Sequence, residues 1–185
     1  MKLQIALVLF GLCSTSSALE LKGMPLGTPM SEVQKQLPEQ KCDEEKLGYM
    51  QCTVAGQTYA GVQPTRFGLV YVNKALEGYS VRLPGKLVEE MKASIEAKIG
   101  PANPLRDYER PNPLKADYGN RPQVWNWTQP NIAHLELRFF GSESLAQRAD
   151  WQTNLFVMSD KASEASKLYS AEKKRRSTNV VKSDM

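Results

Sequence analysis

The chain has 185 residues, of which 41% are hydrophobic and 24% are charged, and its formal net charge at pH 7 is +4. This length and composition fit one domain that can bury a core of ordinary size, and they give no sign of a second domain. The excess charge lies in the tail, since residues 160 to 185 hold seven basic and four acidic side chains, whereas residues 19 to 159 hold sixteen of each. We therefore expect a neutral domain, residues 19–159, and a basic helical or disordered tail, residues 160–185.

Residues 1–18 have the features of a signal peptide. Lys2 supplies the positive charge, Leu3 to Leu12 is a short apolar run, and small residues at positions 16–18 suit cleavage before Leu19. The run is shorter than the roughly twenty apolar residues of a transmembrane helix. Cys13 follows a leucine, where lipoprotein signals carry a small residue, so lipidation is not favoured. The sequence predicts a periplasmic protein without a transmembrane segment, and export fits poorly with nucleic-acid binding.

The N-terminal part of the domain predicts a short helix and then a hairpin. Thr28 is expected to cap the helix, with Pro29 as its first residue and Pro38 at its end. Residues 49–54 and 58–62 predict two short strands that pair across a turn containing Gly56. Between helix and hairpin, residues 41–51 are polar and predict a solvated loop.

Cys42 and Cys52 are the cysteines that remain after removal of the signal peptide. Disulfides persist in exported compartments, and nine intervening residues allow the chain to close a loop. A redox-active pair normally has the spacing Cys-x-x-Cys, and a metal site needs more ligands than two cysteines and a distant His134. We predict a structural Cys42–Cys52 disulfide, with no metal and no cofactor.

Residues 66 to 101 predict two strands and a helix, the most regular part of the sequence. Apolar residues alternate along 67–72 and again along 79–83, with a turn at residues 73–75. From Lys86 the period changes to that of a helix, with an apolar stripe formed by Leu87, Met91, Ile95 and Ile99. Gly100-Pro101 is expected to end the helix.

Residues 101–123 contain five prolines and many charges, which is typical of a long loop. Tyrosine and arginine are enriched at interface hot spots, so four side chains of this loop are candidates for partner binding. These are Tyr108, Arg110, Tyr118 and Arg121. The simpler alternative is an ordinary flexible loop.

Residues 124–128 and 132–140 predict a second hairpin, and residues 153–158 predict the last strand. Trp125 and Trp127 share one face of their strand and suit core packing, because tryptophan buries a large area; a ligand platform is the alternative. His134 is opposite in phase to Leu135 and is expected on the sheet surface. Together the elements predict an α+β fold with an antiparallel sheet of about six strands and two helices.

The tail ends in a basic cluster, Lys173, Lys174, Arg175 and Arg176. Asp160 is placed to cap a helix through about Glu172, although a frayed tail that adds charge without stability is the simpler expectation. Four adjacent cations fit electrostatic attraction to an anionic lipid, a cell-wall polymer or an acidic partner.

The sequence lacks the common catalytic patterns, including Gly-x-Ser-x-Gly, His-Glu-x-x-His and a phosphate-binding glycine loop. The acidic cluster of residues 43–45 lacks the spacing and the glycine of a calcium loop. We expect a protein that is not an enzyme, although an acid pair in a cleft would leave a glycosidase open.

Several segments resemble a family of small exported bacterial proteins. They are Leu21-Lys-Gly-Met-Pro-Leu-Gly-Thr-Pro-Met-Ser-Glu-Val33 with its helix, the cysteine pair, the hairpin around residues 70–76 and the helix end at Lys98-Ile-Gly-Pro101. This pattern is similar to that of the outer-membrane assembly lipoprotein BamE (SmpA) and of β-lactamase-inhibitor protein. The chain departs from the lipoproteins in its large Leu12 and its basic tail.

The resemblance implies a binding scaffold without catalytic apparatus. The first expectation is a periplasmic binding or accessory protein that contacts a protein partner in the envelope. The alternative is a secreted or periplasmic inhibitor or immunity-type protein that blocks a hydrolase.

Overall fold

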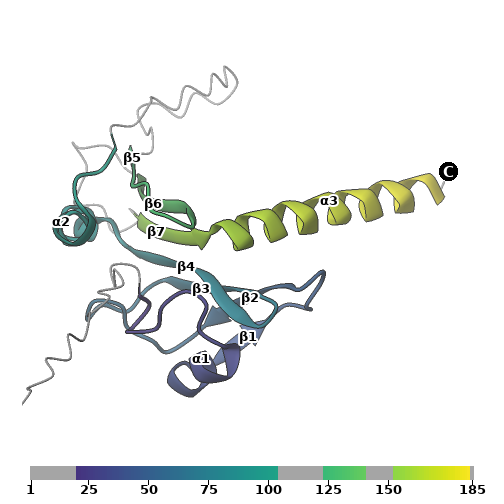
Figure 1. Ribbon diagram of the computed structural model, residues 1–185, viewed down its shortest axis with the longest axis horizontal. Coiled ribbons are helices and arrows are strands. Elements are labelled where there is room, and N and C mark those ends of the chain that lie inside the picture. The colour runs from purple at the N-terminus through teal and green to yellow at the C-terminus, as the bar shows by residue number, and fades with distance from the viewer. Residues whose placement is uncertain (1–19, 104–122, 141–151, 184–185) are drawn as a thin grey trace, which may run out of the picture.

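The structure is a computed structural model that describes residues 20–103, 123–140 and 152–183. In these residues a seven-stranded antiparallel sheet has the order β1-β2-β3-β4-β7-β6-β5, with three α-helices beside it (Figure 1). The elements are α1 (Met30–Gln36), β1 (Gln40–Cys42), β2 (Tyr49–Val54), β3 (Arg66–Val72), β4 (Ala75–Pro84), α2 (Val88–Ile99), β5 (Gln123–Asn126), β6 (Ile132–Phe140), β7 (Gln152–Ser159) and α3 (Asp160–Ser183). The α+β class is confirmed, with seven strands and three helices where about six and two were expected.

Alternation along the strands gives the sheet two different faces. One face carries the main core, in which Leu69, Val81, Leu137 and Val157 are almost completely buried. The N-terminal segment, α1 and α2 cover this face. The opposite face is more polar; there Arg82 donates to Asn154 across β4 and β7 at 2.9 Å. A period of two therefore separates core side chains from surface side chains, as predicted.

The neighbours of β2 differ from the prediction. Residues 58–62 form a tight turn closed by a bridge between Tyr59 and Val62, and they do not pair with β2. The backbone turns there through Ala60 and Gly61, which both have positive φ. β2 pairs instead with β3 and with β1, which lies in the segment expected to be a solvated loop. β1 is short and polar, so its sequence carries no apolar alternation that would reveal a strand.

The predicted disulfide is confirmed. Cys42 and Cys52 are directly opposite in the β1–β2 register and are bonded at 2.03 Å. The cysteine on β2 is buried, while the one on β1 is exposed. The bond therefore holds a three-residue edge strand against the core.

Helix α1 begins differently from the prediction. Pro29 occupies the position before the helix, and no side chain caps the helix start. The Thr28 hydroxyl instead donates to the carbonyl of Pro25 at 2.7 Å, and the Thr28 carbonyl accepts from the Leu76 amide at 2.8 Å. Because Thr28 is buried and tied to β4, its hydroxyl is not available to the helix.

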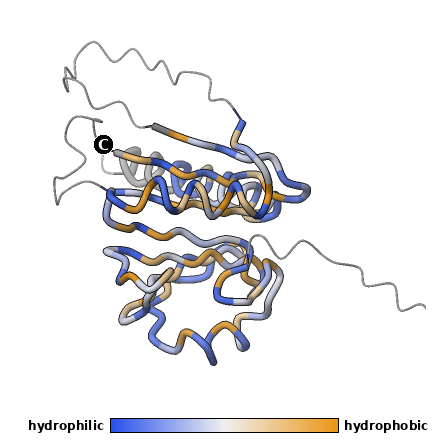
Figure 2. Tube along the Cα trace, turned by 90° about the vertical axis from the view of Figure 1, so that its left-hand side faces the viewer, coloured by the Kyte–Doolittle hydropathy of each residue, from blue (hydrophilic) through white to orange (hydrophobic). Residues whose placement is uncertain are grey.

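Helix α2 forms where the sequence predicts a helix with an apolar stripe. A short 3₁₀ turn, Gly85–Leu87, leads into it, and Val88 and Met91 are buried against the core. The helix ends as expected at Gly100, which has a φ of 93° and donates its amide to the Glu96 carbonyl. The indole of Trp127, buried in the core, donates to the Gly100 carbonyl at 3.0 Å. Figure 2, in which α2 faces the viewer, shows hydrophobic and hydrophilic residues alternating along this helix.

Helix α3 continues directly from β7 and extends to Ser183, well beyond the predicted end near Glu172. Its first turns pack on the polar face of the sheet, where Ala162 is fully buried and the ring of Tyr169 lies 5.3 Å from that of Tyr49. Leu168 points to solvent and is 63% exposed. The expectation that this segment contributes charge alone is therefore revised, because its first turns contribute packing.

Candidate functional site

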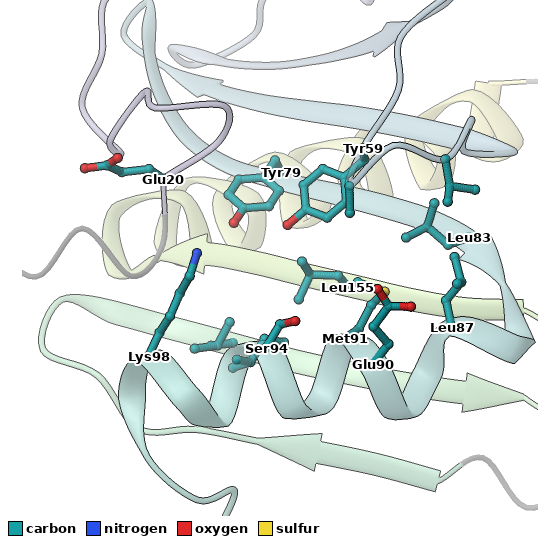
Figure 3. Close-up of a pocket in the computed structure, with 14 residues that line it drawn as sticks. Glu20, Tyr59, Tyr79, Leu83, Leu87, Glu90, Met91, Ser94, Lys98 and Leu155 are labelled. Atoms are coloured by element: carbon teal, nitrogen blue, oxygen red, sulfur yellow. The ribbon is translucent and has the colours of Figure 1, made fainter.

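A pocket of about 330 Å³ lies between α2 and the turn of residues 59–62 (Figure 3). This volume is at the lower end of the range for small-molecule sites. β4, β6 and β7 form its floor through Tyr79, Leu83, Leu135 and Leu155, all nearly inaccessible to solvent. The strands present these residues together because each lies on the core face of the sheet.

Helix α2 forms one wall of the pocket. Leu87, Met91 and Ile95 line it because residues four apart lie on one face of a helix. The apolar stripe that the sequence predicted is therefore only partly used for packing against strands. Part of it faces the pocket.

The main polar feature of the pocket is a pair of tyrosines, Tyr79 on the floor and Tyr59 on the wall opposite α2. Tyr59 is held in the turn by an edge-to-face contact with Phe67, at 6.4 Å between ring centroids. Burial raises the pKa of both Tyr59 and Tyr79 above the ordinary value, so both hydroxyls are neutral at physiological pH. Hydrogen bonding between the two hydroxyls lowers the pKa of Tyr59 and raises that of Tyr79, in each case by less than burial raises it.

Three charged side chains and a serine hydroxyl lie along the rim. Lys98 and Ser94 come from the later turns of α2, Glu90 comes from its first turn, and Glu20 comes from the N-terminal segment. In Figure 3 the Lys98 ammonium points toward the end where the two tyrosine hydroxyls lie, while Glu90 lies at the other end beside Leu87 and Met91. None of the ion pairs in the described ranges involves Lys98. Lys98 therefore supplies a positive charge next to the hydroxyls, with Glu20 at the outer edge of the same end.

Of the residues that the sequence singled out for partner binding, those on α3 do not line this pocket. Tyr108, Arg110, Tyr118 and Arg121 lie outside the described residues. Lys173, Lys174 and Arg175 lie on α3 and are exposed, and α3 also includes Arg176. The Arg175 guanidinium donates twice to the Glu172 carboxylate, at 2.9 and 3.1 Å. The structure thus places the basic cluster and the pocket on different elements.

His134 and the acidic cluster of residues 43–45 do not line the pocket. His134 lies on the polar face of the sheet, 3.4 Å from Glu136 and beside the ring of Phe156. In the acidic cluster, Glu44 pairs with Lys46 at 2.9 Å. Within the described ranges, no group of three or more histidine, cysteine or acidic residues is placed to hold a metal ion. The same ranges contain no helix long and apolar enough to cross a membrane.

Sequence reasoning missed the pocket because its parts are far apart in the chain. Tyr79 was assigned to a strand and Tyr59 to a strand that does not form. The sequence predicts the apolar stripe of α2, but such a stripe is the same whether it packs against other side chains or lines a pocket. No protein-family model matches the chain, and comparison with curated proteins and with solved structures found no significant match.

Proposed function

We propose that the chain is a non-catalytic periplasmic accessory protein that binds an acidic protein partner of the cell envelope through the basic end of α3. The observation that carries this proposal is the position of that helix. At about 1.5 Å per residue, the 24 residues of α3 span about 36 Å. Contacts with the sheet extend to Tyr169, and Figure 1 shows the later turns extending away from the sheet.

The distribution of charge on this extension favours a cleft over a flat surface. Successive helical residues are rotated by about 100°, so three consecutive cations cover about 200° around the axis. Lys173, Lys174 and Arg175 are such a set, and all three are exposed. A helix that lies on a membrane instead needs a continuous apolar face opposite its charges. Cations around much of the helix suit a partner that encloses the helix end with acidic residues.

Electrostatic attraction of this kind accelerates association and is weakened by salt. The neutral body of the protein leaves the tail as the part that attracts an acidic partner. Export, which the first eighteen residues predict, would place this surface in the envelope. Intact-mass measurement of the exported protein should show a chain that begins at Leu19 and carries no lipid; a lipidated Cys13 would contradict that part of the proposal.

The test is crosslinking in cells followed by purification of the tagged protein. One variant carries Lys173→Glu, Lys174→Glu and Arg175→Glu. Its matched control carries Lys35→Glu, Lys41→Glu and Lys86→Glu, which reverse the same number of charges at exposed positions on the body. The proposal predicts a specific partner that is captured by the wild type and the control and lost from the α3 variant.

A partner retained by the α3 variant would refute the role of the basic end and place binding on the body. The alternative function is inhibition of a hydrolase through the sheet face or the 101–123 loop, of which residues 104–122 lie outside the described ranges. A soluble one-to-one complex with a hydrolase that tolerates the α3 substitutions would support that alternative.

A further inference from the structure

We propose that the pocket between α2 and the 59–62 turn binds a small amphipathic carboxylate, with its head group at Lys98 and Tyr59 and its apolar chain along Met91 and Leu155. This site is separate from the basic end of α3. The inference therefore does not depend on the proposed partner binding.

The deep part of the pocket is apolar and closed by packed side chains. Leu83, Leu135, Leu155 and Met91 line it, and their side chains contain only carbon and sulfur heavy atoms. A polar ligand group placed there would lose its hydration without gaining a hydrogen bond, which is unfavourable. This end accepts an alkyl chain or a similar apolar body.

The two tyrosine hydroxyls and the Lys98 ammonium converge at the other end, whereas Glu90 lies on the rim beside Met91. Tyr59 and Tyr79 have two hydroxyl hydrogens, and the bond between them uses one. The hydroxyl hydrogen that this bond does not use is left for a ligand that accepts a hydrogen bond. Tyr79 is only 3% exposed, so a ligand at this position would meet a hydroxyl pair held in a fixed place.

Lys98 decides the charge of the head group. Its ammonium lies toward the hydroxyl end, and its four-carbon stem can adjust to the ligand (Figure 3). Glu20 is at the outer edge of this end, and its carboxylate is turned away from the hydroxyls (Figure 3). A carboxylate can accept from both the ammonium and the Tyr59 hydroxyl, which an alcohol does less strongly and an ammonium cannot do.

The test is isothermal titration of the full-length mature protein with three probes that share one chain, decanoate, decanol and decylamine, each below its aggregation concentration. Decanoate should bind about ten-fold more tightly than decanol, since hydrogen bonds to charged groups contribute more than neutral ones. Lys98→Met keeps the apolar stem and should reduce decanoate affinity to that of decanol. Lys86→Met removes a charge just before the same helix, outside the pocket, and should change neither.

Two further variants locate the ligand. Ser94→Trp places a large side chain at the rim from an exposed position, so it should block decanoate and decanol alike while leaving the fold intact. Tyr59→Phe keeps the ring that packs on Phe67 and should weaken decanoate by a few-fold. Circular dichroism of each variant checks folding.

Three results would overturn the proposal. They are no binding of decanoate to the wild type, decanoate binding that Ser94→Trp and Lys98→Met leave unchanged, or tighter binding of decylamine than of decanoate. The last result would assign the rim to its glutamates and not to Lys98.

Discussion

The Cys42–Cys52 bond should contribute a measurable and calculable share of the stability. The cysteines are 10 residues apart in sequence. In the chain-entropy description, closing a loop of that length lowers the entropy of the unfolded chain by about 9 cal/mol/K, or about 2.7 kcal/mol near room temperature. That is a large fraction of the roughly 5–15 kcal/mol that stabilises a typical domain.

The position of the two cysteines allows this contribution to be isolated. Cys42 is exposed, so Cys42→Ser removes the bond while adding a hydroxyl where it can be hydrated. Cys52 stays as a small apolar side chain in the core, 3% exposed. Cys52→Ser should cost about 1–3 kcal/mol more than Cys42→Ser, because its hydroxyl would be buried among apolar side chains.

Urea unfolding with reductant, followed by circular dichroism, measures both variants. Cys42→Ser should lose about 2.7 kcal/mol relative to the oxidised wild type, and the reduced wild type should match it. Reductant should not affect the variant, which serves as the control. If the oxidised wild type and Cys42→Ser unfold at the same urea concentration, the entropic argument is wrong for this loop.

Three further predictions concern the stability of the sheet and of the helix α3 that packs on it. A chain ending at Ser159 lacks the burial and ring contact of Tyr169, so its free energy of unfolding should fall by about 2 kcal/mol or more. A chain ending at Glu172 keeps those contacts and should have the melting temperature of the wild type. Equal melting temperatures for all three chains would show that α3 does not pack on the sheet. Gly78→Ala would put a methyl carbon 2.8 Å from the Val157 carbonyl oxygen. The free energy of unfolding should therefore fall by about 1–3 kcal/mol, measured by thermal unfolding. An unchanged melting temperature would contradict the register of β4 and β7. Burial raises the pKa of Tyr71 to about 12, from 10.0 in the unfolded chain; the neutral hydroxyl is favoured by folding, so this stabilisation is complete below about pH 10 and is lost as the pH rises toward 12. Tyr71→Phe should therefore lose less stability than the wild type over that pH range, and equal losses would argue against the shift.

Elements whose pattern is local could be predicted from the sequence alone. The alternation in residues 67–72 and 132–140 predicted β3 and β6, and the apolar stripe ending at Gly100 predicted α2. The period of side chains along a strand or helix is set by neighbouring residues, so one segment is enough to read it. The cysteine pair was equally readable, since only two cysteines remain in the expected mature chain.

Which segments pair or pack together is known only from the three-dimensional structure. β4 pairs with β7, more than seventy residues later, in Arg82↔Asn154, and the polar segment Gln40–Cys42 becomes a strand because β2 offers it an edge. The pocket depends on the same kind of contact, since Tyr59 and Tyr79 come from a turn and a strand and face a helix from a third segment. Pairing and cavity formation depend on the free energy of contacts between distant residues, and no local pattern records which of those contacts will form.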